Sequence, residues 1–162
     1  MLLAVEDSVN CLDSPRRIRY RGAQMAESIR KVDLFSIEIA HKTGEGAKAL
    51  GVFRDAGVGL VAVWGYPTKG KKGRIDLVAA DKAALTKAAK KAGIVLGPKQ
   101  TAFLLEGDDQ TGALAGLLGK LAEGGINVIA AQAVCGGEGK FGGVITVGAE
   151  DVKKAAKLLG AK

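Results

Sequence analysis

The sequence contains one segment twice, and this repeat constrains the fold more than any other feature. Residues 35–60 align with residues 103–128 without a gap over 26 positions. Allowing one or two residues of slip, residues 85–93 also match residues 152–160. A repeat of this length is a whole supersecondary unit, so the chain is expected to fold as two similar units. The identical positions are Phe35/Phe103, Glu38/Glu106, Thr43/Thr111, Gly44/Gly112, Ala47/Ala115, Leu50/Leu118, Gly51/Gly119 and Gly57/Gly125.

The size and composition fit two small units with aliphatic cores. Of the 162 residues, 48% are hydrophobic but only 4% are aromatic, which is enough for a core of Ala, Val, Leu and Ile. No apolar run reaches the roughly 18–20 residues of a membrane span, and Glu6 and Asp7 come too early for a signal peptide. Cys11 and Cys135 are isolated, without metal-ligand or disulfide spacing. We therefore expect a cytoplasmic protein with no cofactor, no metal and no membrane association.

The net charge of +7 is concentrated in the first copy. Residues 25–98 hold thirteen Lys/Arg against seven Asp/Glu, whereas residues 99–162 hold seven of each. A basic patch could bind nucleic acid or an acidic partner. A solvated surface is the simpler interpretation, because the lysines of residues 82–93 have the spacing of an exposed helix face and no aromatic residues accompany them. Nucleic acid stays an alternative partner.

The first thirty residues match nothing in the repeat. We expect residues 1–30 to be a disordered extension, with Pro15 and a basic run over residues 16–21. A basic arm for nucleic acid or membrane is the functional alternative. Met25 begins MAESIRKV and is an alternative start of the protein.

Each copy shows the same order of predicted elements, β-α-β-β-α. Alternating and β-branched runs predict strands, and apolar spacing of three and four predicts helices. Asp81 is expected to cap the second helix of the first copy. The first copy is predicted as strand 32–40, helix 43–57, strands 60–66 and 74–79, helix 82–93 and a short fourth strand 94–96; the second as strand 101–107, helix 112–123, strands 126–135 and 141–147 and helix 150–159.

This order predicts the α+β class with two ferredoxin-like units. Each unit has an antiparallel sheet with both helices on one face. We place the units at residues 31–98 and 99–162. Their sheets can join edge to edge or stack, and either arrangement covers strand edges.

The strand-to-helix loops resemble those of the ACT domain, a small amino-acid-binding regulatory module. In the second copy a strand leads to Glu106-Gly107-Asp108-Asp109-Gln110-Thr111-Gly112, and the helix ends at Gly124-Gly125 before Ile126-Asn127-Val128. The first copy is a degenerate match in which Gly59 replaces the asparagine. The resemblance covers residues 32–162 and is closest to stand-alone tandem ACT proteins, which carry no catalytic domain.

The resemblance implies a ligand site on the second copy. The helix N-terminus after Gly112 would receive a carboxylate, an aspartate would receive an α-ammonium group, and Asn127 would offer a donor and an acceptor. Thr43 and Thr111 are alternatively helix caps, the aspartates favour the helix N-terminus, and Asn127 is a turn residue. The expected ligand-binding residues are Asp108, Asp109, Gln110, Thr111, Gly112, Ala113, Asn127 and Val128, with His41 and Lys42 of the first copy as the opposite wall.

The remaining candidates are assigned structural roles. His41 has no nucleophile or paired carboxylate beside it in the sequence, which favours a surface histidine. Trp64 and Tyr66 share one face of a strand and are expected to pack on a sheet or between the copies. Cys135 is expected to be a small buried hydrophobe. Residues 69–74 lack the spacing of a phosphate loop.

The leading functional hypothesis is a non-catalytic sensor that binds a small amino acid between ACT units. It would act through a homodimer or a partner protein. A ligand-free interaction module is the first alternative, and a regulator of nucleic acid is another. An acylphosphatase-like enzyme is disfavoured because residues 40–44 and 108–112 contain no arginine.

Overall fold

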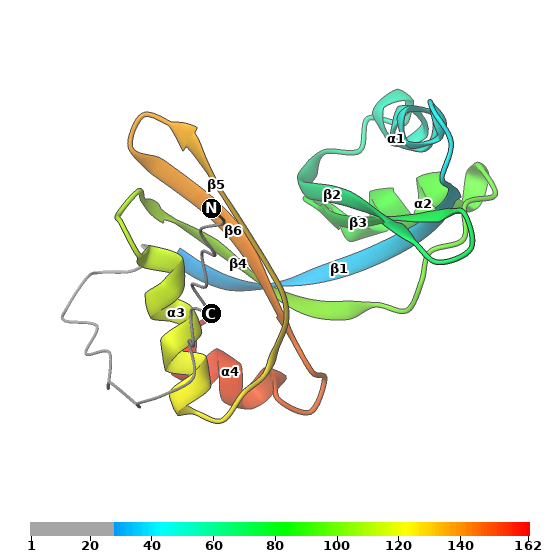
Figure 1. Ribbon diagram of the computed structural model, residues 1–162. Coiled ribbons are helices and arrows are strands. Elements are labelled where there is room, and N and C mark those ends of the chain that lie inside the picture. Colours follow the sequence, from blue (N-terminus) through cyan, green and yellow to red (C-terminus); the bar gives the residue numbers. More distant parts are fainter. Residues whose placement is uncertain (1–27) are drawn as a thin grey trace, which may run out of the picture.

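The computed structural model describes residues 28–162. The expected N-terminal extension therefore lies outside the described residues, except for residues 28–30, which are not an extension but the start of the first strand. Figure 1 shows how the elements are arranged. Their bounds are β1 Ser28–Ala40, α1 Glu45–Asp55, β2 Leu60–Thr68, β3 Lys72–Ala79, α2 Lys82–Lys91, β4 Gln100–Asp108, α3 Ala113–Glu123, β5 Val128–Gly137, β6 Lys140–Val147 and α4 Val152–Leu159.

The two units share one antiparallel sheet of six strands. Its order is β2-β3-β1-β4-β6-β5, so the first strands of the two units, β1 and β4, pair at its centre (Figure 1). The α+β prediction of two ferredoxin-like units is confirmed, and of the two arrangements left open the sheets join edge to edge.

A pseudo-twofold axis passes between β1 and β4 at the pair Asp33 and Thr101, near one end of their ladder. Asp33 pairs with Thr101, and these residues occupy equivalent positions of the repeat. The equivalence extends beyond the segment visible in the sequence, because β2 and β5 carry an irregularity at the same place, Leu60/Ala62 and Val128/Ala130. Each position of unit 1 thus has a structural counterpart in unit 2.

Strand β1 is longer than one unit requires because it serves both. Residues 34–40 pair with β3 inside unit 1, whereas residues 28–34 pair with β4 of unit 2. The predicted start at residue 32 was therefore wrong, because the polar first residues of β1 are fixed by the other unit. The predicted strand 94–96 is also wrong: in this segment only Leu96 forms an isolated bridge, to Ile37 of β1.

The helices cover one face of the sheet over two separate cores. Side chains alternate along a strand, and Ile29, Phe35 and Ile37 of β1 all point towards helices. Phe35 packs under α1 and α2 with Phe53 and Leu85, and its counterpart Phe103 belongs to the core under α3 and α4. Both phenylalanines are thus core residues.

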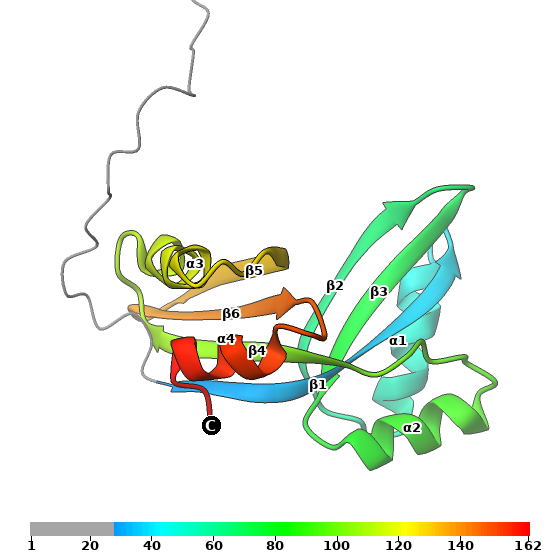
Figure 2. The same cartoon turned by 90° about the horizontal axis from the view of Figure 1, so that it is seen from below.

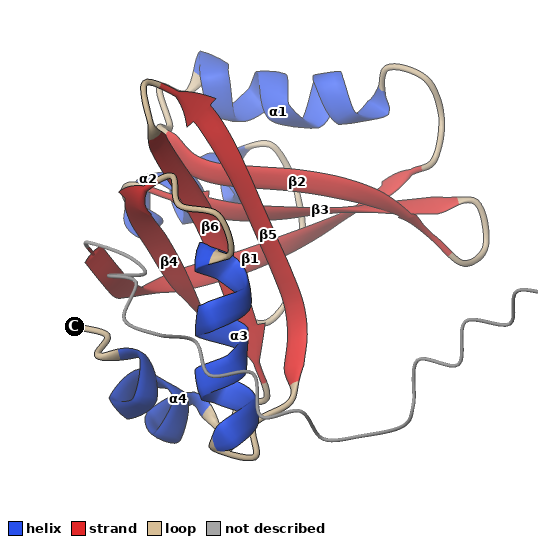
Figure 3. Cartoon of the chain, turned by 60° about the vertical axis from the view of Figure 1, so that its left-hand side comes forward, coloured by secondary structure: helices blue, strands red, loops and turns tan. Residues whose placement is uncertain are grey.

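The opposite face holds a third core where the two units meet. Figures 2 and 3 show that the two halves of the sheet cross steeply, with β5 passing in front of β2 and β3. The buried residues of this face come from both units: Leu34, Val78, Ala102, Leu104 and Val144. Ala62 and Trp64 of β2 pack against them, which confirms that Trp64 lies between the copies.

Candidate functional site

The helices α1 and α3 begin at glycine and have no side-chain cap. Gly44 and Gly112 are the N-cap residues, with φ of 86° and 83°, a left-handed conformation that glycine adopts without strain. The alternative that Thr43 and Thr111 cap these helices is wrong, because the glycine occupies the cap position. The first N–H groups of both helices are consequently not satisfied by a capping side chain.

The loop before α3 packs against the β5–β6 hairpin. The Lys140 ammonium lies 2.7 Å from a carboxylate oxygen of Asp108, and the Asp109 N–H donates to the Gly139 carbonyl at 2.7 Å. The Cys135 thiol donates to the Asp109 carboxylate, which raises the pKa of Cys135. Cys135 is exposed, contrary to the prediction of a buried hydrophobe, because it lies near the end of an edge strand.

The structure divides the expected ligand residues of unit 2 into two groups. Asp108 to Ala113 form one continuous turn into α3. Asn127 and Val128 stand at the start of β5, whereas this turn lies beside the end of β5. A strand rises about 3.3 Å per residue, so Asn127 is roughly 30 Å from the turn along the strand. One chain alone does not bring the two groups together.

His41 and Lys42 lie at yet another place. They follow β1, and β1 and β4 run in opposite directions from the paired residues Asp33 and Thr101. The end of β1 is therefore on the order of 40 Å from the end of β4 along the sheet. His41, Lys42 and Thr43 line a surface hollow of about 590 Å³ of their own. Within one chain they do not form the opposite wall of the α3 turn.

A buried carboxylate on the helix-free face was missed in the sequence. Asp76 of β3 is 3% exposed and accepts hydrogen bonds from Ser36 Oγ at 2.6 Å, Arg74 Nε at 2.7 Å and Tyr66 OH at 3.1 Å. Its counterpart in unit 2 is Val144. The same fold therefore forms in unit 2 with an uncharged residue at this position. A comparison of the two copies along this strand would have shown that the carboxylate of Asp76 is not required by the fold.

Two side chains of this cluster have perturbed proton affinities. The hydrogen bond to Asp76 raises the pKa of Arg74, so the arginine stays charged. Burial, and then the negative charge of Asp76, raise the pKa of Tyr66. The cluster thus joins the Asp76 carboxylate to one guanidinium and two hydroxyl donors.

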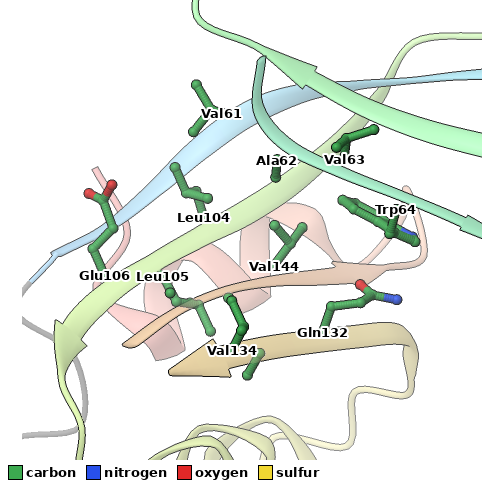
Figure 4. A pocket seen from close by; sticks show the side chains of 13 residues that line it. Val61, Ala62, Val63, Trp64, Leu104, Leu105, Glu106, Gln132, Val134 and Val144 are labelled. Atoms are coloured by element: carbon green, nitrogen blue, oxygen red, sulfur yellow. The ribbon is translucent and has the colours of Figure 1, made fainter. Parts of the chain in front are cut away.

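Two clefts flank Trp64 where the helix-free faces meet. The cleft in Figure 4 is about 420 Å³ and lies between β2 and the β5–β6 pair. The second is about 250 Å³ and contains the Asp76 cluster. The clefts are related by the pseudo-twofold axis, because Trp64 and Gln132 are counterparts, as are Arg74 and Gly142. Within residues 28–162, the buried polar side-chain atoms without a partner are Trp64 Nε1 and Gln132 Oε1.

The described residues show neither a metal site nor a membrane-spanning helix. Across residues 28–162 no group of three His, Cys, Asp or Glu side chains is placed to hold a metal ion. None of the four described helices combines the length and apolar character needed to cross a bilayer.

The fold is that of a tandem pair of ACT domains. It is similar to protein BT0572 from Bacteroides thetaiotaomicron, with a TM-score of 0.70, 19% identity, and coverage of 82% of this chain and 88% of that one. The ligand-free regulatory subunit of aspartate kinase from Thermus thermophilus matches with a TM-score of 0.56 and 15% identity over 85% of this chain and 97% of that one.

A third structure contains the fold as part of a larger enzyme. The aspartate kinase of Clostridium acetobutylicum has a TM-score of 0.52 and 17% identity, and 81% of this chain covers 33% of that one. No family model and no curated protein matches the sequence. At these identities the likeness establishes the fold alone.

Proposed function

We propose that this protein is a non-catalytic regulatory protein that binds a small amino acid at the turn into α3. The observation that carries the proposal is the uncapped start of α3 beside an acidic residue. The Ala113 N–H donates to the Gln110 carbonyl, and the N–H groups of the next residues, Leu114 and Ala115, suit an α-carboxylate. The Asp109 carboxylate, one turn earlier, suits an α-ammonium group. Gln110, Thr111 and Ala113 would form the rest of the wall.

A second copy of the chain would complete this site. Strand β5 is an edge of the sheet, contains no charged residue, and exposes Ile129 and Val134 to 72% and 69%. Such an edge is open to pairing. Antiparallel pairing of two β5 strands would place Asn127 and Val128 of one copy beside the α3 turn of the other. Pairing of β5 with β2 of a second copy would instead place Asn127 near His41 and Lys42.

The compared structures support a regulatory role rather than a catalytic one. The Thermus thermophilus protein is the regulatory subunit of an aspartate kinase, and the Clostridium acetobutylicum protein is described as an allosteric enzyme. Binding would act here by favouring one association state over another, which requires different affinities for the two states.

A thermal-shift screen with the twenty amino acids tests the proposal. At a free concentration of about 100 times Kd, binding to the native state adds about 2.7 kcal/mol, which raises Tm by roughly 5–10 °C for a chain of this size. Asp109→Ala and Asn127→Ala should reduce the shift, whereas Asp55→Ala, an exposed carboxylate in unit 1, should not. No shift with any amino acid would overturn the proposal, and binding unaffected by both variants would move the site elsewhere.

The uncharged edge strands also favour a second candidate function, a ligand-free interaction module. In that case the chain would associate through β2 or β5 without any small molecule. Sedimentation of the protein with and without amino acids separates the two, because only the sensor changes its association when the ligand is added.

A further inference from the structure

We propose that the cleft in Figure 4 is a second binding site, for a small uncharged molecule with an apolar body and one amide group. The cleft lies between the units on the helix-free face and shares no residue with the turn into α3. Variants that act on one site and not on the other therefore test the two sites separately.

The size and lining of the cleft suit a small apolar molecule. Its volume of about 420 Å³ lies within the usual range of roughly 300–1,000 Å³ for ligand pockets. Most of the residues that line it are apolar and come from both units: Val61, Ala62 and Val63 from β2, and Leu104, Val134 and Val144 from the strands opposite. A bound molecule would be largely removed from water.

One unused donor and one unused acceptor lie together at one end of this cleft. Figure 4 shows Trp64 of β2 next to Gln132 of β5. The indole Nε1–H of Trp64 and the amide oxygen of Gln132 are both buried and without a partner. A buried polar atom left unpaired costs about 1–3 kcal/mol, so two such atoms at one place indicate a missing group. A carbonyl oxygen would accept from Trp64, and an N–H would donate to Gln132.

The charges around the cleft select an uncharged head group. Among the residues that line it, the charged one is Glu106, at the end away from Trp64 and Gln132 (Figure 4). Glu106 already lies 3.6 Å from Arg30. A carboxylate or ammonium head would lose its hydration without a countercharge, whereas an amide needs only the donor and the acceptor that are present.

Gly142 keeps the cleft open. Its counterpart in unit 1 is Arg74, whose long side chain occupies the corresponding face. A Cβ at Gly142 would meet only the Leu105 carbonyl at 3.8 Å, an ordinary contact. The fold therefore has room for a side chain at this position, and Gly142→Leu would fill the cleft without disturbing the strands.

The chain contains one tryptophan, so emission from Trp64 reports on the cleft directly. We expect hexanamide, titrated to about 50 mM, to change this emission saturably. Hexanoate and hexylamine, which have charged heads on the same chain, should bind at least tenfold more weakly. Gly142→Leu should abolish the response. Gly51→Leu adds a side chain on α1, where a Cβ would meet only the Arg54 guanidinium at an ordinary 3.9 Å, and it should leave the response intact.

A second variant tests the role of the amide acceptor. Gln132→Leu should weaken hexanamide about fivefold or more but leave methyl hexanoate, which has a carbonyl and no N–H, unchanged. An absent response to hexanamide, equal binding of hexanoate, or a response that survives Gly142→Leu would each overturn the proposal. The amino-acid site is tested separately, by the effect of Asp109→Ala on the thermal shift. Either proposal can therefore be refuted without affecting the other.

Discussion

Replacing Asp76 by valine should destabilise the protein, although the same fold already carries Val144 at the equivalent position. The carboxylate accepts three hydrogen bonds, from Ser36, Arg74 and Tyr66. A hydrogen bond to a charged group contributes about 1.5–3 kcal/mol, and a partner left buried and unpaired adds its own desolvation cost. Arg74 is 35% exposed at its side chain and Tyr66 is 43% exposed, so both can recover water. We therefore expect Asp76→Val to cost about 2 kcal/mol, not the sum of three bonds.

The second half of the experiment removes the Ser36 hydroxyl as well. Replacing both partners of a buried polar contact by apolar groups is often close to neutral. In the double variant Ser36→Ala/Asp76→Val we expect more than half of the loss to be recovered, which corresponds to a coupling of about 1 kcal/mol or more. Urea denaturation followed by circular dichroism measures all four free energies of unfolding.

The control separates a buried from an exposed carboxylate. Asp55 also pairs with an arginine at 2.8 Å, but its side chain is 69% exposed. Exposed pairs contribute little, so Asp55→Ala should change stability by less than about 0.5 kcal/mol. Additive losses in the Ser36/Asp76 cycle, or an Asp76→Val protein as stable as the parent, would refute the reasoning that Asp76 organises this cluster.

Three further predictions test other parts of the fold. Asp81 accepts hydrogen bonds from two N–H groups of α2, whereas Asp151 makes no side-chain cap for α4; Asp81→Ala should cost about 1 kcal/mol in urea unfolding and Asp151→Ala much less. Gly143→Ala should lower Tm, because its Cβ would lie 2.8 Å from a backbone oxygen, whereas Gly142→Ala meets only an ordinary contact and should not. A hydrogen bond from Lys82 lowers the pKa of Asp33, so the charged Asp33 stabilises the folded protein. Asp33→Asn should therefore be less stable than the parent above about pH 4, and the difference should disappear as the pH falls through the depressed pKa. A constant difference in the free energy of unfolding down to about pH 2.5 would contradict this.

The element order was predictable because it depends on local signals. Helix-ending glycines, alternating strands and the Asp81 cap act within a few residues of themselves. Both Asp81 as a cap and Gly57 in the left-handed conformation are found in the structure. The repeat supported these assignments, because a strand or helix that is weakly indicated in one copy is indicated again in the other.

The strand pairing between the units could not be read in the same way. Residues 28–31 are mostly polar and form a strand because Phe103 to Glu106 of the other unit pair with them, and such register is set by distant partners. The same holds for the candidate site. Asp109 and Asn127 were expected in one ligand site, yet Asp109 follows β4 and Asn127 precedes β5, at opposite ends of the unit. The Asp76 cluster joins three strands and becomes visible only when their register is known.

The shared strands determine how a bound molecule could affect the whole chain. Because β1 continues from unit 1 along β4 of unit 2, the units cannot separate without breaking the centre of the sheet. What can vary is the twist between the halves, and this sets the distance from β2 to β5 across the cleft. A molecule between these strands would favour one twist, and the same strands are the two edges open to pairing. Occupancy of the cleft would thus be coupled to association at the edges, and by reciprocity association would change the affinity of the cleft.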